Sequence, residues 1–158
     1  MKTIIISKPV DLWTKIMLED GLDNLTFVRS EDQEMLNAIN QARQSIHGFL
    51  ETFFNPKPNQ KSFLLKIVFE DHERIEHIWL ADLDLDSSPP TGLVANETSF
   101  PGLQYMSRVD FSANRITDWM YLEDNFLVGG FTTRLLQARK AKNQGRGLKR
   151  FLPWRKNV

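Results

Sequence analysis

The clearest pattern of apolar and polar positions along the chain covers residues 116–130. Four large side chains stand in a row at 119–122, two acids and an asparagine follow at 123–125, and apolar residues return at 126–128. This order predicts a tight hairpin with well-buried strands. The pair Gly129–Gly130 then predicts a backbone position that only glycine adopts easily.

A second pattern repeats apolar residues every three or four positions and predicts one long helix in the N-terminal half of the chain. The hydroxyl of Ser30 is suited to cap its first turn, with Gln33 at the reciprocal position of a capping box. The prolines of residues 55–58 end it. The apolar stripe consists of Met35, Leu36, Ile39, Ala42, Ile46, Phe49, Leu50 and Phe53. Such a stripe needs a flat apolar surface to pack against.

That surface is predicted to be a sheet, because apolar residues alternate with polar ones on either side of the turn 70–74. The predicted strands are 62–69, 75–80, 93–95, the segment containing Leu103, Tyr105, Met106, Val109 and Phe111, and the two arms of the hairpin. A helix with a basic C-terminal end is predicted after the glycine pair, with Thr132 or Thr133 as its N-terminal cap. The expected fold is therefore α+β: a compact antiparallel β-sheet of about five to seven strands, one long helix packed on it, and a short C-terminal helix.

The length of 158 residues suits one domain. We expect residues 1–29 to form an N-terminal extension packed on the domain, 30–142 the α+β domain, and 143–158 a basic tail. No apolar run approaches the roughly 20 residues of a membrane-spanning helix, and the isoleucines at 4–6 are too few for a signal-peptide core. The chain has no cysteine, which excludes disulfides, thiolate catalysis and cysteine-ligated metals. A cytoplasmic location is the default expectation.

Charge is distributed unevenly although the formal net charge is zero. Residues 1–133 hold all 20 acids but only 11 of the 20 bases, a net charge of −9, and the other nine bases follow from Arg134 onward. An acidic body with a basic tail presents two different electrostatic surfaces to a partner.

Several short segments together resemble a known family. They are Val68-Phe69, residues 75–80, Thr91-Gly92, Asn96-Glu97, residues 116–121, residues 129–132 with Arg134 and Leu136, and the lead-in 55–58. In this combination the chain resembles the YegJ-like family, the domain of unknown function 2314, over roughly its central two-thirds. The resemblance implies a compact α+β domain with an antiparallel sheet. It brings no accepted activity, cofactor or catalytic residue.

His77 is the most attractive candidate for chemistry, since histidine titrates near neutral pH and can serve as a general base. The alternative, which we prefer, is a core or half-buried histidine bonded to a carboxylate or a carbonyl. His47, His72 and His77 do not have the spacing of a metal site.

Three further motifs have both a functional and a structural interpretation. Asp82, Asp84 and Asp86 resemble the ligands of a calcium loop, but leucines fill the intervening positions, and we interpret them as an exposed strand face. Asp118 with 123–124 could supply two carboxylates for glycoside chemistry, but acidic residues with asparagine are common in turns. Arg134 after the glycine pair could receive a phosphate, but the spacing of a phosphate-binding motif is missing. We therefore assign no catalytic residue, no metal site and no cofactor.

The basic tail carries eight positive charges between Arg139 and Lys156, with Phe151 and Trp154 among them. Its candidate contact residues are Arg146, Lys149, Arg150, Trp154 and Arg155. Bases interleaved with aromatic residues are suited to nucleic acid or to an anionic membrane surface. The alternative is a solvated terminus that only balances the acidic body.

These observations favour a non-catalytic protein-binding module over an enzyme. The acidic body, with Asp82, Asp84 and Asp86 as candidate contacts, is suited to a basic partner, as in an immunity-type or regulatory protein. The alternative is an accessory protein that contacts nucleic acid or an anionic membrane through its tail. An enzyme using His77 ranks last.

Overall fold

The computed structural model describes residues 32–144, which form one antiparallel six-stranded sheet and three α-helices. The strand order is β4-β3-β2-β1-β5-β6. The elements are α2 (Gln33–Gln44), α3 (Ile46–Phe54), β1 (Gln60–Glu70), β2 (Ile75–Asp84), β3 (Thr91–Val94), β4 (Arg108–Asp110), the 3-10 turn η2 (Ala113–Arg115), β5 (Ile116–Glu123), β6 (Phe126–Gly129) and α4 (Phe131–Gln144). The α+β class with an antiparallel sheet is thereby confirmed.

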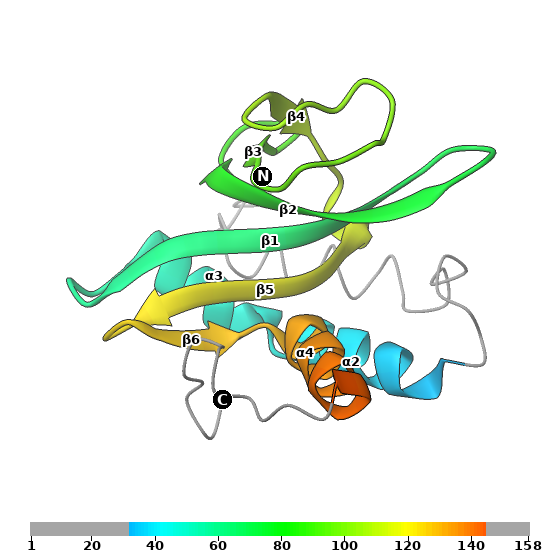
Figure 1. The fold of residues 1–158 in the computed structure, drawn as a ribbon. Coiled ribbons are helices and arrows are strands. Elements are labelled where there is room, and N and C mark those ends of the chain that lie inside the picture. Colours follow the sequence, from blue (N-terminus) through cyan, green and yellow to red (C-terminus); the bar gives the residue numbers. More distant parts are fainter. Residues whose placement is uncertain (1–31, 145–158) are drawn as a thin grey trace, which may run out of the picture.

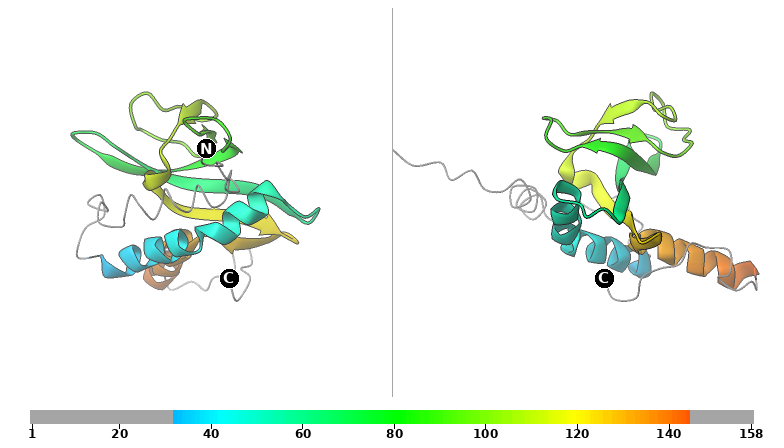
Figure 2. Two further views of the ribbon diagram at one scale, coloured as in Figure 1. Left: turned by 180° about the vertical axis from the view of Figure 1, so that it is seen from behind. Right: turned by 90° about the vertical axis from the view of Figure 1, so that its left-hand side faces the viewer.

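The helices are arranged on both sides of the sheet. Helices α2 and α3 lie behind the sheet in Figure 1, whereas α4 leaves the β6 side of the sheet and extends towards the opposite side (Figures 1 and 2). Within residues 32–144, no helix is both long and apolar enough to cross a membrane. The predicted N-terminal extension and most of the predicted tail fall outside the described residues.

The prediction of one long helix is wrong, because the apolar stripe is divided between α2 and α3 at Ser45. The Ser45 hydroxyl bonds the carbonyl oxygens of Gln41 at 2.7 Å and Ala42 at 3.2 Å. Such back-bonding by a serine bends or interrupts a helix. The start of α2 is capped by Asp32, whose Oδ1 accepts the backbone N–H of Met35 at 3.1 Å, while the predicted cap, Ser30, lies outside the described residues.

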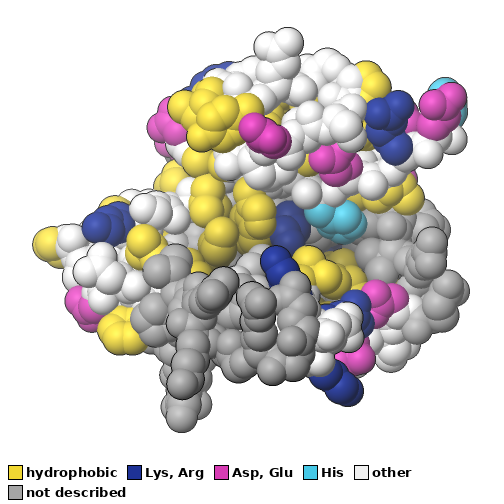
Figure 3. All heavy atoms as spheres, viewed as in Figure 1, with side chains coloured by type: hydrophobic (Ala, Val, Ile, Leu, Met, Phe, Trp, Pro, Cys, Tyr) yellow, Lys and Arg dark blue, Asp and Glu magenta, His cyan; other side chains and the backbone are white. Residues whose placement is uncertain are grey.

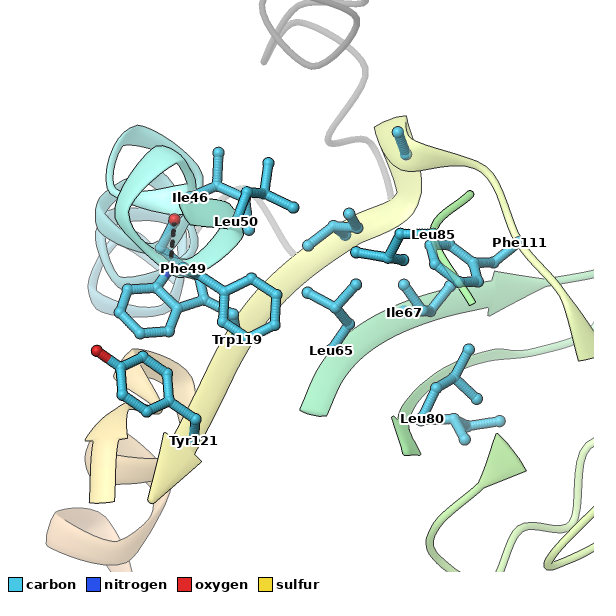
Figure 4. Packing of buried hydrophobic residues seen from close by; sticks show 14 of the residues in the cluster. Ile46, Phe49, Leu50, Leu65, Ile67, Leu80, Leu85, Phe111, Trp119 and Tyr121 are labelled. Atoms are coloured by element: carbon cyan, nitrogen blue, oxygen red, sulfur yellow. Dashed lines mark hydrogen bonds between the residues drawn. The ribbon is translucent and has the colours of Figure 1, made fainter. Parts of the chain in front are cut away.

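The core lies between helices α2 and α3 and one face of the sheet. Trp119 is 2% exposed and its indole N–H donates to the carbonyl of Ala42 at 2.9 Å, which bonds strand β5 to α2 (Figure 4). The ring of Phe49 packs 5.5 Å from that of Trp119. Leu65 and Ile67 of β1 point to the same side and are almost fully buried. Burial of these side chains supplies most of the driving force for folding.

The hairpin predicted at 116–130 is confirmed as β5 and β6. Asp124 and Asn125 both have positive φ, 52° and 66°, as a two-residue type I′ turn requires. Gly129 has φ +83°, and a Cβ there would lie 2.4 Å from atoms of Trp119. The chain therefore needs glycine at this position for two independent reasons.

The strand predicted from 103 to 111 is much shorter than expected, since only Arg108–Asp110 pair with β3. Residues 95–107 instead form a loop in which Tyr105 and Met106 are 59% and 57% exposed. Met106 has φ +68°, and this left-handed conformation takes the segment out of the extended backbone that strand pairing needs.

Candidate functional site

Buried and half-buried polar side chains gather on the face of the sheet that α2 and α3 do not cover. The register places Lys66 of β1 opposite Trp79 of β2 on one side and opposite Asp118 of β5 on the other. Side chains at paired positions point to the same face, and His77, two residues before Trp79, shares it. Figure 3 shows this side of the molecule, where a histidine and Lys or Arg side chains lie in a hollow below β2.

Asp118 is the best-connected member of this group and is fully buried. Its Oδ1 accepts the backbone N–H groups of Trp119 at 2.8 Å and Phe131 at 3.1 Å. Its Oδ2 accepts the backbone N–H of Thr132 at 2.8 Å and the Thr132 hydroxyl at 2.6 Å. The carboxylate thus caps the N-terminus of α4 from a neighbouring strand, where helix amides and the helix dipole favour negative charge.

Lys66 completes the network. Its Nζ donates to the Thr132 hydroxyl oxygen at 2.7 Å and lies 4.8 Å from the centre of the Trp79 ring. Burial lowers the pKa of Lys66, which the charge of Asp118 opposes, and burial raises the pKa of Asp118, which Thr132 and Lys66 oppose. Because four donors point at the Asp118 oxygens, we assign Asp118 the ionised form, with Lys66 as its cation. The cluster Asp118–Thr132–Lys66, here called the buried ionic cluster, joins α4 to β5 and β1.

His77 lies at the margin of this cluster and is half-buried. Its Nδ1 is 3.2 Å from the hydroxyl of Thr117. Burial, aided by the positive charge of Lys66, lowers the pKa of His77 to about 4. The imidazole is therefore neutral at neutral pH and a weak base, and the Thr117 hydroxyl is one of its partners.

Arg134 is in the first turn of α4. Its guanidinium lies 5.8 Å from the Phe131 ring centre, and burial lowers its pKa while Asp118 opposes that shift. At this helix N-terminus, where a phosphate site was considered for Arg134, two of the amide donors are occupied, because Phe131 and Thr132 bind the Asp118 carboxylate.

The acidic candidates Asp82, Asp84 and Asp86 lie at the C-terminal end of β2 and just beyond it, and they are exposed. Asp82 forms an ion pair with Arg108 of β4, and Asp84 Oδ1 accepts the backbone N–H groups of Asp86 and Ser87, both at 3.1 Å. Within residues 32–144, no group of three histidine or acidic side chains is placed to hold a metal ion.

The other carboxylates considered with Asp118 do not approach it. Glu123 accepts the side-chain amide of Gln60 at 2.6 Å, and Asp124 that of Asn59 at 3.0 Å. Both sit at the hairpin turn, five or six residues further along, which is about 16 Å or more in an extended strand. The candidate tail residues Arg146, Lys149, Arg150, Trp154 and Arg155 lie outside the described residues.

Lys66 and Thr132 are members of the cluster that the sequence did not single out. A signal was present for Lys66, because it interrupts the apolar run 63–69, and a charge inside a buried strand requires a partner. Nothing in the pattern identified that partner, which lies 66 residues later.

The protein is an α+β domain with a six-stranded antiparallel sheet, in which an aspartate of the β5–β6 hairpin caps the following helix α4. The profile of the family described as "Uncharacterized protein conserved in bacteria (DUF2314)" matches residues 32–149, and the chain belongs to this family. The chain is 27% identical over 133 residues to the "Uncharacterized protein YegJ" of Escherichia coli (strain K12), covering 84% of this chain and 86% of that protein. No solved structure matches.

Proposed function

We propose that this protein is a non-catalytic protein-binding module whose acidic body binds a basic partner, in the manner of an immunity-type or regulatory protein. The observation that carries the proposal is the pair Tyr105 and Met106, each more than half exposed on the loop before β4. An aromatic ring and a methionine are the side chains most enriched where proteins bind one another.

Exposed acidic side chains lie on or next to β2 and β4, the strands on either side of β3, and the Met106 backbone is bonded to the end of β3. The register aligns Asp84 of β2 and Asp110 of β4 on either side of Thr91, and Asp82 and Asp86 are also exposed. In Figure 3, hydrophobic side chains lie next to Asp and Glu side chains over the upper strands. We call Tyr105, Met106, Asp82, Asp84, Asp86 and Asp110 the acidic surface. An apolar centre with a charged rim is the usual composition of a protein interface.

The loop holds Tyr105 and Met106 in a fixed position. The backbone N–H of Met106 donates to the carbonyl of Val94 at the end of β3 at 2.8 Å, and the Ser107 hydroxyl donates to the Gln104 carbonyl at 2.6 Å. A preorganised loop loses less conformational entropy on binding, which favours recognition.

Two properties of the polar face support binding over catalysis. The acceptor sites of Asp118 are occupied by donors of its own chain, and His77 is neutral and weakly basic. The net charge of −9 on residues 1–133 would speed the encounter with a basic partner and make it dependent on salt.

Affinity purification of the full-length chain from a bacterial extract at low salt, followed by mass spectrometry, tests the proposal. We expect a basic protein to be recovered with wild type and lost with the double variant Tyr105→Ser, Met106→Ser. The variant Asp82→Asn, Asp86→Asn should weaken recovery and reduce its salt dependence.

Matched controls alter exposed residues away from the acidic surface. Phe126 is 39% exposed at the hairpin, and the Glu73 side chain is 83% exposed on the β1–β2 turn. Phe126→Ser and Glu73→Gln should leave recovery unchanged. Equal loss with the controls, or no basic partner at all, would contradict the proposal.

A second candidate function rests on α4. Its sequence carries no acid, and Lys140 and Lys142 are exposed near its C-terminal end, while Arg139 is bonded to Asp32 at 2.7 and 3.1 Å. Lys140 and Lys142 lead directly into the basic tail, so they would extend a contact with nucleic acid or anionic lipid. Deletion of 145–158 combined with Lys140→Gln and Lys142→Gln should abolish such binding while leaving the acidic surface intact.

A further inference from the structure

A groove separates the end of α2 from the beginning of α4, on a different part of the molecule from the acidic surface. Its volume is about 520 Å³, and it is lined by Gln41, Gln44, Ser45, Phe131 and Arg134. This volume is within the range of about 300–1,000 Å³ that is typical of small-molecule sites.

The lining residues define which ligand the groove would accept. Among the described residues that line the groove, Arg134 is the charged one and none is acidic. A guanidinium binds a carboxylate through two parallel hydrogen bonds, which gives both affinity and orientation. The side-chain amides of Gln41 and Gln44 each offer donors and an acceptor, the set that matches the N–H and C=O of a ligand amide.

The groove is also connected to the core. The Ser45 hydroxyl oxygen lies 3.2 Å from Trp119 Nε1, and the Phe131 ring packs edge-on against the Trp119 ring at 5.6 Å. A ligand in contact with Ser45 or Phe131 would change the surroundings of the Trp119 indole N–H.

We propose that this groove binds a ligand in which a carboxylate adjoins an amide, the chemistry shared by N-acyl amino acids and by the C-terminus of a peptide. Arg134 holds the carboxylate, Gln41 and Gln44 bind the amide, and Phe131 contacts the apolar part. The site is independent of the acidic surface and of any partner bound there.

Nuclear magnetic resonance titration of the full-length, 15N-labelled protein provides the test. The probes are N-acetylglycine, its uncharged counterpart N-acetylglycinamide, acetate and inorganic phosphate. We expect N-acetylglycine to shift the side-chain amide signals of Gln41 and Gln44 and the indole signal of Trp119, and to bind more tightly than acetate. N-acetylglycinamide should produce no shift.

Substitutions test which residues bind the ligand. Arg134→Gln should weaken binding of N-acetylglycine roughly tenfold or more, because a charge-assisted pair is lost. Arg134→Lys should also weaken it, since lysine cannot form the two parallel bonds. Gln44 is exposed, so Gln44→Glu should keep the fold while its negative charge repels the carboxylate. The matched control is Gln33→Glu, the same change at an exposed position of α2 outside the groove.

The outcomes are separable. Shifts that disappear in Arg134→Gln and Gln44→Glu but persist in Gln33→Glu support the proposal, and tighter binding of acetyl-triglycine would identify a peptide end as the source. Equal shifts with phosphate or acetate, shifts that survive Arg134→Gln, or no shift with any probe would overturn it.

Discussion

Asp118 and the aspartates at 82–86 are chemically identical side chains in opposite environments. Asp118 is fully buried and accepts four hydrogen bonds from residues of β5 and α4. Asp82, Asp84 and Asp86 are exposed: Asp82 pairs with one arginine, and Asp84 accepts backbone amides of its own turn, among them that of Asp86. The comparison teaches that the number and burial of donors around a carboxylate, more than its sequence motif, decide whether it maintains the fold or faces a partner.

The two regions also differ in how their charge is balanced. The buried ionic cluster contains its own cation, Lys66, within one hydroxyl of the carboxylate. The acidic surface has one basic neighbour, Arg108, for Asp82, so within the described residues its negative charge exceeds its positive charge. Charge that is compensated inside the chain stabilises it, whereas an excess at the surface acts on other molecules.

The same substitution at one position of each region should give the largest contrast. Asp118→Asn removes the charge that compensates buried Lys66 and turns one carboxylate oxygen into a donor facing other donors. We expect a loss of about 3 kcal/mol or more in unfolding free energy. Asp82→Asn, at an exposed ion pair, should cost about 0.5 kcal/mol or less, and asparagine tolerates its φ of 43°.

Urea denaturation of both variants measures this contrast. Equal losses at the two positions would mean that the cluster is not the stronger determinant of stability, and that burial of Asp118 is not used to hold α4 on the sheet.

His77 should make the margin of the cluster sensitive to acid. Its pKa falls from 6.5 in the unfolded chain to about 4 in the folded one, so at intermediate pH the unfolded state binds more protons. The contribution of neutral His77 to the free energy of unfolding is present in full above pH 6.5 and is lost as pH falls through about 4. The loss should reach up to about 3 kcal/mol.

The measurement compares wild type with His77→Gln across this pH window. Lys66 and Thr117 are among the charged and polar groups around His77, and glutamine can still bond to the Thr117 hydroxyl. We expect the advantage of wild type over the variant to shrink on acidification. His72→Gln, at the exposed β1–β2 turn, is the control and should retain the wild-type pH dependence. A pH-independent difference for His77→Gln would contradict the assignment.

The sequence predicted the fold where regular periodicity decides it. The hairpin at 116–130 and the pair β1–β2 follow from alternation and turn chemistry. The division of the long helix did not follow, because the apolar stripe continues through Ser45 and the interruption arises from two local hydrogen bonds. The short β4 was missed for a similar reason, since the left-handed Met106 leaves no trace in an apolar pattern.

The candidate site was predictable in part. Asp118 and Arg134 were singled out, but for chemistry with other partners, and Lys66 could have been suspected as a charge in an apolar strand. Their arrangement depends on three elements meeting, β1, β5 and α4, with bonds that span 14 and 66 residues. Sequence periodicity contains no information about such contacts, so the cluster could be found only from the structure.

Within the cluster, Lys66 should matter less than Asp118. Lys66→Met leaves the carboxylate with four donors and places an apolar side chain beside Trp79. We expect a loss of about 1–2 kcal/mol, smaller than that of Asp118→Asn. In the double variant the two losses should fall short of additivity by about 1 kcal/mol or more, because they remove one shared interaction. Strict additivity in urea denaturation would show that the two charges do not interact.

A substitution at the backbone strain of the acidic surface should change stability with the opposite sign. Met106 has a left-handed backbone with φ +68°, which costs a non-glycine residue about 1–2 kcal/mol, part of which glycine would lose again through chain entropy. Met106→Gly should therefore stabilise the protein by about 1 kcal/mol or less, while removing an exposed apolar side chain from the acidic surface. Under the proposed function, the variant should unfold at higher urea concentration and yet recover less of the basic partner. Greater stability with undiminished recovery would mean that the strain at Met106 has no role in binding, and would leave Tyr105 as the apolar contact to test.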